Sequence, residues 1–293
     1  MIQMVVFDMD GVLVDIDSSW QVVHRAFSVD NSENLQRHQR GEITYTEFVH
    51  SDIGLWGRIH QNQIQQILAT VPLMHGVKTT FTHLHQAGKT TAIISSGLMP
   101  LANRLRALYD IDYVYANELR ADMNGYLTGE GDSYITLDNK GDILTQLCTC
   151  TQIPLENCAV IGDSRFDLPL FDLAGLSIAF NAKDSAIQHA ADITIASSNL
   201  SDVLPWLLAN RITRGDLSFT YPSTQQATTI VNAILPDNRH LPVGLLITTY
   251  SHEREVKIRV VTTKGLSTVL ATLDDLLLNI QIIEKTFPIL DTV

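Results

Sequence analysis

The sequence has few cysteines and no long hydrophobic run, and each shortage excludes a class of protein. The three cysteines, Cys148, Cys150 and Cys158, form no C-x-x-C pair, and an odd number cannot make a complete disulfide framework. We expect packed thiols in a reducing compartment. No stretch approaches the roughly 18 apolar residues of a membrane span, and Asp8 comes too early for a signal peptide. The sequence therefore predicts a cytoplasmic protein without a membrane partner.

Positive charge is also scarce. The chain has 20 Lys and Arg against 32 Asp and Glu, a formal net charge of −12. Residues 1–210 hold 12 basic and 24 acidic side chains, whereas residues 211–293 hold 8 of each. Non-specific nucleic-acid binding depends on basic side chains that neutralise phosphates, so a nucleic-acid partner is not expected. The acidic first part suits a site that collects a divalent cation.

The length and the residue pattern predict two domains. At 293 residues the chain exceeds the usual size of one hydrophobic core, and its 45% hydrophobic content is typical of globular proteins. After Trp206 the pattern changes from buried strands to strands that alternate apolar and polar residues. We therefore predict a first domain at residues 1–210 and a small α+β domain at residues 211–293.

Buried strands alternate with helices in the first domain. Apolar runs end at Asp8, Ser95 and Asp163, and a last strand is expected near residues 177–180. A helical insertion at about residues 16–75 and a hairpin near residues 124–131 interrupt the alternation. This order predicts an α/β fold with a doubly wound parallel sheet, in which ligands bind at the carboxyl ends of the strands. Other helices are expected at residues 78–88, 99–108 and 167–173, and after Lys140.

Acidic residues follow two of these strands. Asp8 and Asp10 are separated by one residue, and Gly11 permits a sharp turn after them. A bare D-x-D pair is as often two solvated loop residues as a site. A second cluster, Asp163 and Asp167, follows another apolar strand, which a parallel sheet could bring beside the first. Hard carboxylate oxygens suit Mg²⁺, which prefers a few carboxylates together with water and phosphate.

Four segments in this order resemble the motifs of the haloacid-dehalogenase-like (HAD) phosphohydrolase superfamily. They are D-M-D-G-V-L-V at residues 8–14, I-I-S-S-G around Ser95, D-N-K-G-D around Lys140, and G-D-S-R-F-D at residues 162–167. The resemblance covers about residues 1–207. It implies Mg²⁺-dependent phosphoryl transfer through an aspartyl-phosphate, and the second aspartate of the first motif favours a phosphatase or a phosphomutase.

The resemblance also implies a role for each motif residue. Asp8 is the expected nucleophile and Asp10 the acid and base, while Asp8, Asp163 and the Asp10 carbonyl are expected to hold Mg²⁺. Lys140 is expected to neutralise charge on the phosphoryl group, with Asp167 supporting it. The expected phosphate-binding residues are Ser95, Ser96, Gly97 and Lys140.

Within this superfamily the chain looks most similar to phosphoserine-phosphatase-type members with a helical cap. In those members a cap glutamate follows the first motif and a cap arginine binds the substrate carboxylate, and the aligned residues here are Asp17 and Asp52. An aspartate in place of the arginine would repel a carboxylate, which argues against phosphoserine as the substrate. Arg40 or Arg58 could compensate, or could be ordinary surface charges. Trp20 and Trp56 are expected to be packing residues.

Residues 216–287 resemble the small dimerising subunit of the KEOPS tRNA-modification complex. The order strand, helix, strand, strand and long helix predicts a βαββα fold. The last helix, at about residues 265–283, carries an apolar stripe wider than a small sheet covers, which predicts a homodimer. An alternative is a scaffold protein linked to tRNA modification, in which the phosphatase site is secondary. The balanced charge of this domain gives no basic surface for tRNA.

Overall fold

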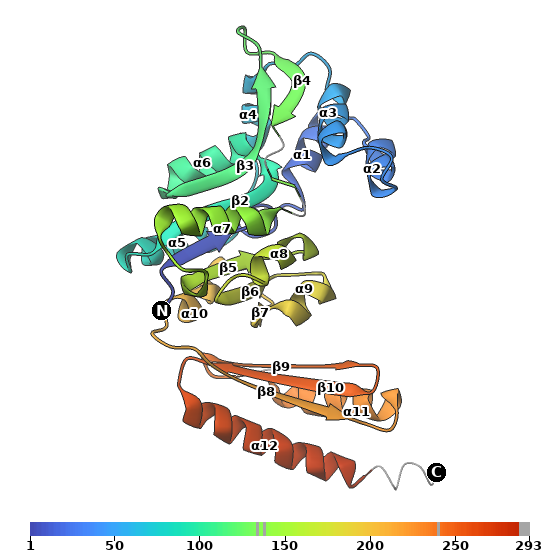
Figure 1. Cartoon of the computed structure of the whole chain (residues 1–293), viewed down its shortest axis with the longest axis vertical. Coiled ribbons are helices and arrows are strands. Elements are labelled where there is room, and N and C mark those ends of the chain that lie inside the picture. Colours follow the sequence, from blue (N-terminus) through green and yellow to red (C-terminus); the bar gives the residue numbers. More distant parts are fainter. Residues whose placement is uncertain (133–134, 137–138, 239–240, 287–293) are drawn as a thin grey trace. The chain divides into compact units, whose positions relative to one another are not determined.

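The computed structural model describes residues 1–132, 135–136, 139–238 and 241–286 (Figure 1). The chain divides into two compact units, Ile2–Leu204 and Pro205–Val293. The short helix α10 (Leu204–Leu207) lies at the division. The boundary predicted near residue 211 falls between α10 and the first strand of the second unit.

A mostly parallel sheet forms the centre of the first unit. Its strand order among the described residues is β4-β3-β2-β1-β5-β6-β7. The central strand β1 consists of four buried apolar residues and pairs in parallel with both β2 and β5. Among these strands β4 alone runs antiparallel, as the second arm of the expected hairpin. The strands are β1 (Met4–Phe7), β2 (Thr90–Leu98), β3 (Tyr113–Ala121), β4 (Leu127–Asp132), β5 (Cys158–Gly162), β6 (Leu176–Phe180) and β7 (Ile193–Ile195).

Helices cover both faces of this sheet, so the predicted doubly wound α/β fold is confirmed. On one face Met4 and Val6 belong to a buried cluster with side chains of α7, α8 and α9. On the other face the ring of Phe7 lies 5.2 Å from that of Phe81 on α5, which stacks in turn on Tyr109 of α6. The helices are α5 (Val77–Gln86), α6 (Met99–Tyr109), α7 (Lys140–Thr151), α8 (Leu168–Phe171) and α9 (Ser185–Ala190).

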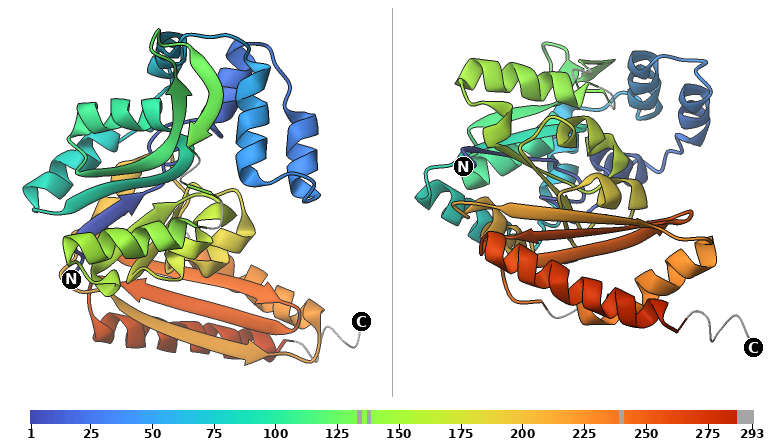
Figure 2. Two further views of the ribbon diagram at one scale, coloured as in Figure 1. Left: turned by 45° about the horizontal axis from the view of Figure 1, so that its top comes forward. Right: turned by 60° about the horizontal axis from the view of Figure 1, so that its bottom comes forward.

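Four helices form a cap between β1 and α5. The cap helices α2 and α3 stand beside the β3–β4 hairpin in Figure 2 (left), and α3 packs against β4. A capping box explains where α3 begins, because Thr44 and Glu47 each accept a hydrogen bond from the other's backbone N–H. The helices are α1 (Ser19–Ala26), α2 (Ser32–Gln39), α3 (Tyr45–Leu55) and α4 (Gln61–Ala69).

Three details of the first unit differ from the sequence prediction. The strand near residues 177–180 is not the last, because the three-residue strand β7 follows it. A 3-10 turn at Arg165–Asp167 precedes α8, so the helix predicted at residues 167–173 is shorter. The side chains of Cys148 and Cys158 are buried free thiols as expected, but Cys150 is exposed. Strand β7 and helix α8 are too short to show a periodicity in the sequence, and the pattern around Cys150 does not reveal that this position of α7 is exposed.

The second unit has the predicted βαββα order. Its antiparallel sheet has the strand order β8-β10-β9, and α11 and α12 pack together on one face (Figure 2, right). The strand β8 alternates between partly buried and exposed residues, because only one face of the sheet is covered. The elements are β8 (Thr213–Thr220), α11 (Thr224–Ile234), β9 (Leu245–His252), β10 (Glu255–Thr262) and α12 (Leu266–Glu284).

One face of helix α12 packs into the core of the second unit. Val269, Leu276 and Ile280 are buried in the core of the second unit. Of the helices in the described part of the chain, only α12 is long and apolar enough to cross a membrane by length and composition. Its packing onto the sheet explains the apolar residues of the inner face without a membrane.

Candidate active site

The first site residue follows β1 directly. Asp8 is buried, and its Oδ1 accepts a hydrogen bond from the backbone N–H of Met9 at 2.8 Å. The chain then turns back, with the N–H of Leu13 donating to the Met9 carbonyl at 2.8 Å. Gly11 has φ +79°, in the left-handed region that glycine adopts without strain. As a result Asp8 and Asp10 line the same cavity.

Lys140 is held between two carboxylates at the start of α7. Its Nζ lies 2.6 Å from Oδ1 of Asp167 and 3.3 Å from Oδ2 of Asp8, and its side chain is 1% exposed. Burial alone would lower the pKa of Lys140, but the charges of Asp167 and Asp8 outweigh it and raise the pKa above its usual range. The lysine is therefore a fixed positive charge beside Asp8.

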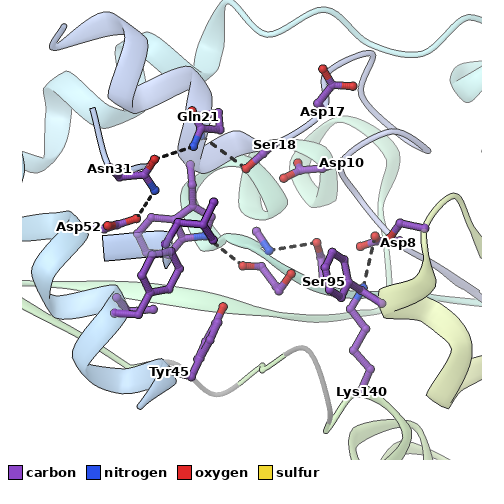
Figure 3. Close-up of a pocket in the computed structure, with 18 of the residues that line it drawn as sticks. Asp8, Asp10, Asp17, Ser18, Gln21, Asn31, Tyr45, Asp52, Ser95 and Lys140 are labelled. Carbon is purple, nitrogen blue, oxygen red and sulfur yellow. Dashed lines mark hydrogen bonds and ion pairs between the residues drawn. The ribbon is translucent and has the colours of Figure 1, made fainter. Parts of the chain in front are cut away.

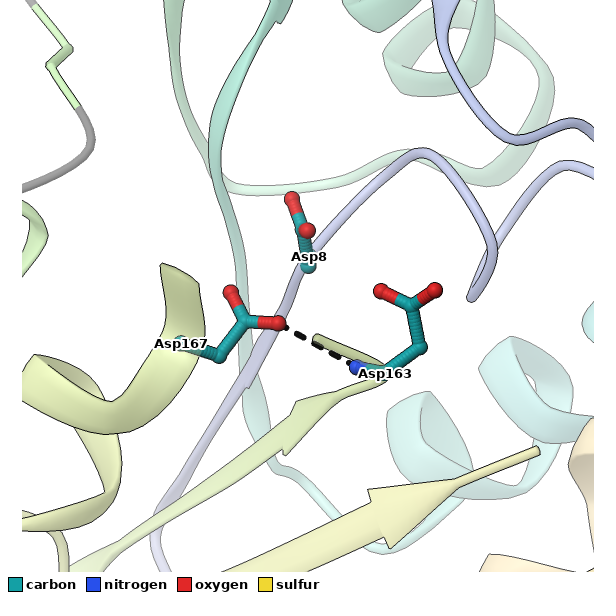
Figure 4. A group of neighbouring side chains, drawn as sticks. All are labelled: Asp8, Asp163 and Asp167. Carbon is teal, nitrogen blue, oxygen red and sulfur yellow. Dashed lines mark hydrogen bonds between the residues drawn. The ribbon is translucent and has the colours of Figure 1, made fainter. Parts of the chain in front are cut away.

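Three carboxylates meet at the ends of β1 and β5 (Figure 4). Oxygen atoms of Asp8, Asp163 and Asp167 all lie within 4.8 Å of one another. Burial, followed by the charge of Asp8, raises the pKa of Asp163 to about 8. Carboxylates this close repel one another unless a cation or a proton lies between them, and hard oxygen atoms are the ligands that Mg²⁺ prefers. This donor set fits a divalent cation.

Asp10 lies outside that group and is held by Ser19 at the start of the cap. Its Oδ2 accepts hydrogen bonds from the backbone N–H of Ser19 at 2.7 Å and from the Ser19 hydroxyl at 2.8 Å. Its Oδ1 is buried and has no hydrogen-bond partner among the residues that the structure describes. Burial raises the pKa of Asp10 to about 6, although the hydrogen bonds from Ser19 oppose the shift. One carboxylate oxygen of Asp10 is thus anchored, and the other keeps its capacity for a hydrogen bond.

The end of β2 provides a loop beside Asp8. Ser95 is buried, and its hydroxyl oxygen accepts the backbone N–H of Gly97 at 3.1 Å, which leaves the hydroxyl hydrogen free to donate. A Cβ on Gly97 would lie 2.8 Å from the Ser19 hydroxyl and 3.0 Å from Oδ2 of Asp10, so a larger residue would collide there. The carbonyl of Ser96 accepts hydrogen bonds from Trp20 and Asn117, at 3.0 and 2.9 Å.

One cavity of about 290 Å³ lies between the core and the cap (Figure 3), and Asp8, Asp10 and Asp163 line it whereas Asp167 does not. The core contributes the acidic residues, Lys140 and the Ser95 loop. The cap contributes apolar and aromatic side chains and polar ones in equal number, among them one buried carboxylate, Asp52. Trp20, expected as a packing residue, lines the cavity, whereas Trp56 is buried beside His24. The cap residues that line the cavity are Asp17, Ser18, Trp20, Gln21, Asn31, Leu35, Tyr45, Phe48, Val49 and Asp52.

The residues considered for substrate choice lie in different surroundings. Asp17 is exposed and pairs with Lys183 at 3.0 Å, whereas Asp52 is buried. Neither cap arginine lines the cavity, because Arg40 bonds to Glu42 at 2.6 Å and Arg58 lies over the ring of Tyr126.

Two residues that hold other site residues in place lie outside the four sequence motifs. Ser19 links the cap to Asp10, and its hydroxyl also accepts the N–H of Leu98 at 3.1 Å. Asn117 on β3 is buried and connects Ser96 to Ile135, accepting one hydrogen bond and donating another at 2.9 Å each. Ser19 could have been suspected as a helix start after Ser18, but nothing in the sequence around Asn117 marks its partners.

Comparison with curated proteins gives one consistent group of relatives. The chain is 32% identical over 206 residues to a phosphoserine phosphatase of Idiomarina loihiensis, covering 69% of this chain and 91% of that protein. It is 25% identical to a phosphoserine phosphatase of Methanocaldococcus jannaschii, covering 70% and 97%. It also matches a phosphoserine phosphatase of Archaeoglobus fulgidus at 31% identity, covering 68% of this chain and 58% of that longer protein.

Solved structures agree on the fold. A phosphoserine phosphatase with an analogue of its phospho-aspartyl intermediate has a TM-score of 0.61 at 24% identity, covering 70% of this chain and 99% of that chain. A substrate-bound phosphoserine phosphatase has a TM-score of 0.62, covering 71% and 99%. The haloacid dehalogenase-like hydrolase family matches residues 2–175, more than half of the sequence. The chain therefore belongs to the haloacid dehalogenase-like hydrolase family.

Proposed function

We propose that this protein is a Mg²⁺-dependent phosphatase that hydrolyses a small phosphomonoester through an aspartyl-phosphate on Asp8. The observation that carries the proposal is the placement of Asp8, 3.3 Å from Lys140 and within 4.8 Å of Asp163, in a cavity under the cap. A carboxylate can attack an anionic phosphate only where positive charge shields the two from each other. The phosphoserine phosphatase relatives support the reaction class.

The reaction proceeds in two displacements. A carboxylate oxygen of Asp8 bonds to phosphorus, the bond between phosphorus and the alcohol oxygen breaks, and Asp10 gives its proton to that oxygen. Water then attacks phosphorus and returns a proton to Asp10, the bond to Asp8 breaks, and inorganic phosphate leaves. Because Ser19 donates twice to Oδ2 of Asp10, the transferable proton belongs on the unpartnered Oδ1.

The other residues hold the phosphoryl group. The Ser95 hydroxyl and the backbone around Ser96 and Gly97 donate to the phosphoryl oxygens. Lys140 neutralises the negative charge of the phosphoryl group and of Asp8. Asp167 fixes Lys140 through the 2.6 Å contact. When bound by Asp8, Asp163 and the Asp10 carbonyl, Mg²⁺ would supply further positive charge at the phosphoryl oxygens.

Phosphate release from p-nitrophenyl phosphate with Mg²⁺ tests the proposal. The parent protein should turn over, and Asp8→Asn should lower kcat by about a thousandfold or more because the nucleophile is lost. Asp15→Asn is the matched control, since Asp15 is an exposed aspartate of the same loop. Equal rates for Asp8→Asn and the parent would reject the mechanism. A phosphomutase would instead return the phosphate on the organic product.

We also propose that the second unit forms a homodimer through α12 and that the protein acts in the cytoplasm. Leu266, Leu270, Leu278 and Ile282 are each more than half exposed on the outer face of α12, although they are apolar. An apolar stripe of this kind on a soluble protein is favourable to association. The βαββα order is compatible with the likeness to the dimerising KEOPS subunit. The free cysteines fit a reducing compartment.

A further inference from the structure

Resting on the proposed phosphatase function, we propose that the cap selects phosphomonoesters whose alcohol carries a protonated amine and no carboxylate. Asp52 is the residue that holds the amine. It lies on α3, is 2% exposed, and lines the cavity at the end away from Lys140 and Asp8 (Figure 3). Four observations carry this assignment: the partners of Asp52, their charge, the acceptor position that remains, and the rest of the cavity lining.

Three side chains hold the Asp52 carboxylate. Oδ2 lies 2.7 Å from the amide nitrogen of Asn31 and 3.1 Å from Nε2 of His24, while Oδ1 lies 3.0 Å from the amide nitrogen of Asn34. The Asn31 amide is itself oriented, because its oxygen accepts a hydrogen bond from Gln21 at 3.0 Å. The carboxylate is therefore fixed in position before any substrate enters.

None of these partners cancels the negative charge. The indole N–H of Trp56 can only donate, and it lies 2.9 Å from Nδ1 of His24, so that nitrogen must be the acceptor. The ring hydrogen is then on Nε2, and His24 is a neutral donor to Asp52. Together with two neutral amides this leaves a buried carboxylate without a cationic partner in the described part of the chain, which is costly unless a ligand supplies one.

The carboxylate also keeps capacity for one more donor. An ionised carboxylate offers about four acceptor positions. Oδ2 of Asp52 receives two hydrogen bonds and Oδ1 receives one. An ammonium group that enters from the cavity would fill the remaining position with a charge-assisted hydrogen bond.

The remaining lining favours a cation over an anion at this end. Among the described residues that line the cavity, Lys140 has the one cationic side chain, and it is already held by Asp8 and Asp167. The aromatic side chains of Trp20, Tyr45 and Phe48 line the space near the cap, and aromatic faces attract an ammonium group. A substrate carboxylate would find no positive partner there and would be repelled by Asp52.

Matched phosphomonoesters test the inference. O-phosphoethanolamine and O-phospho-L-serine differ by one carboxylate, glycerol phosphate lacks the amine, and p-nitrophenyl phosphate reports basal activity. We expect kcat/KM for O-phosphoethanolamine to exceed that for O-phospho-L-serine and glycerol phosphate by about tenfold or more, as one charge-assisted contact allows. A parent protein that prefers O-phospho-L-serine would overturn the inference.

Two variants assign the effect to Asp52. Asp52→Asn should lower kcat/KM for O-phosphoethanolamine by about tenfold or more, and should lower it less for glycerol phosphate, which has no amine to lose. Leu35→Lys adds a cation at a partly exposed lining residue and avoids any folding defect at Asp52, so it should reduce the preference by a similar factor. Glu33→Gln is the control, because it removes an exposed carboxylate of the same cap. An equal loss for all substrates in Asp52→Asn, with no change of preference in Leu35→Lys, would reject the assignment.

Binding separates this inference from the proposed function. Calorimetry on the Asp8→Asn protein measures affinity without turnover, with O-phosphoethanolamine and O-phospho-L-serine as the titrants. Tighter binding of O-phosphoethanolamine, lost when Asp52→Asn is added, would support the inference even if no substrate were hydrolysed. Tighter binding of O-phospho-L-serine would reject it while leaving the phosphatase proposal intact.

Discussion

Gly11 and Asp163 lie against each other across the ends of two neighbouring strands. A Cβ atom on Gly11 would overlap the carboxylate of Asp163, so the close approach of the two loops requires glycine at this position. The turn that follows Asp8 also needs the positive φ of Gly11, +79°. One glycine therefore meets two separate requirements: the turn of the first loop and the space for the acidic group of the second.

Gly11→Ala should lower phosphatase kcat by about a hundredfold. The new methyl group would displace the Asp163 side chain from its position beside the Asp8 carboxylate. Gly41→Ala is the matched control. Gly41 has a similar φ of +70°, but a Cβ there would meet nothing within 4 Å, so it has the backbone strain without the collision. Steady-state kinetics should show a near-normal Gly41→Ala protein. Similar losses in both variants would mean that strain alone explains the effect.

Lys140→Met should inactivate the protein and lower the free energy of unfolding. Removing the lysine leaves Asp8 and Asp167 as buried charges without their cation, and breaking such a pair typically costs about 3–5 kcal/mol. Adding Asp167→Asn removes one of the two charges, so the double variant should recover part of this stability but none of the activity. Urea unfolding without Mg²⁺ measures the stabilities. A double variant less stable than Lys140→Met would contradict the charge argument.

Mg²⁺ should raise the thermal stability of the parent protein in the absence of substrate. A ligand that binds only the folded state at 100 times its Kd adds about 2.7 kcal/mol. Asp163→Asn removes one of the three clustered carboxylates and should abolish most of the increase, whereas Asp172→Asn, outside this group, should not. Scanning calorimetry with Mg²⁺ or EDTA provides the measurement. An unchanged midpoint in the parent would argue against the proposed metal site.

Much of the fold could be predicted because its signals are local. The strands β1 and β5 are short buried apolar runs, and each ends at an aspartate that the parallel sheet brings to the same edge. Strand β7 cannot be predicted in this way, because its three residues, Ile193–Ile195, are too few to show a periodicity. The order of helices and strands in the second unit was predictable because its one-sided sheet produces a clear alternation.

The site was only partly predictable, because some of its contacts join distant residues. The motif around Asp8 and Asp10 indicates the carboxylates, but not that Ser19 would bind Asp10 or that Oδ1 would lack a partner among the described residues. The sequence shows only that Asp52 stands where related phosphatases have an arginine. The neutral partners of its carboxylate depend on how three cap helices pack together. Contacts of this kind appear only once the fold is known.

Asn117→Ala should weaken the phosphate loop. Asn117 donates to the carbonyls of Ser96 and Ile135 at 2.9 Å each and accepts the N–H of Ile135. The Ser96 carbonyl keeps its bond from Trp20, but the buried polar groups of Ile135 lose their partner, which costs about 1–3 kcal/mol. We expect kcat/KM for p-nitrophenyl phosphate to fall by about tenfold, since the loop positions the phosphoryl group. Asn103→Ala, an exposed asparagine on α6, is the control. Normal kinetics in a destabilised Asn117→Ala protein would show that this residue supports the fold alone.

The exposed stripe of α12 leads to the last prediction, a dimer that strengthens as salt is added. Asp274 is exposed and lies halfway between Leu270 and Leu278, so a twofold antiparallel pairing of the helices would bring two copies of it together. Salt screens this repulsion and does not weaken the apolar contacts. Light scattering should therefore give twice the 32.5 kDa chain mass, with a smaller dissociation constant at higher salt.

Substitutions on the two helices of the second unit can separate this interface from general effects of charge. Leu270→Asp with Leu278→Asp places charges on the stripe without touching the buried residues Val269 and Leu276, so the protein should become a folded monomer. Thr228→Asp adds charge at an exposed residue of α11 and should leave the dimer intact. A parent protein that stays monomeric at high concentration, or a dimer that survives both leucine substitutions, would exclude α12 as the interface and leave its apolar face without a partner.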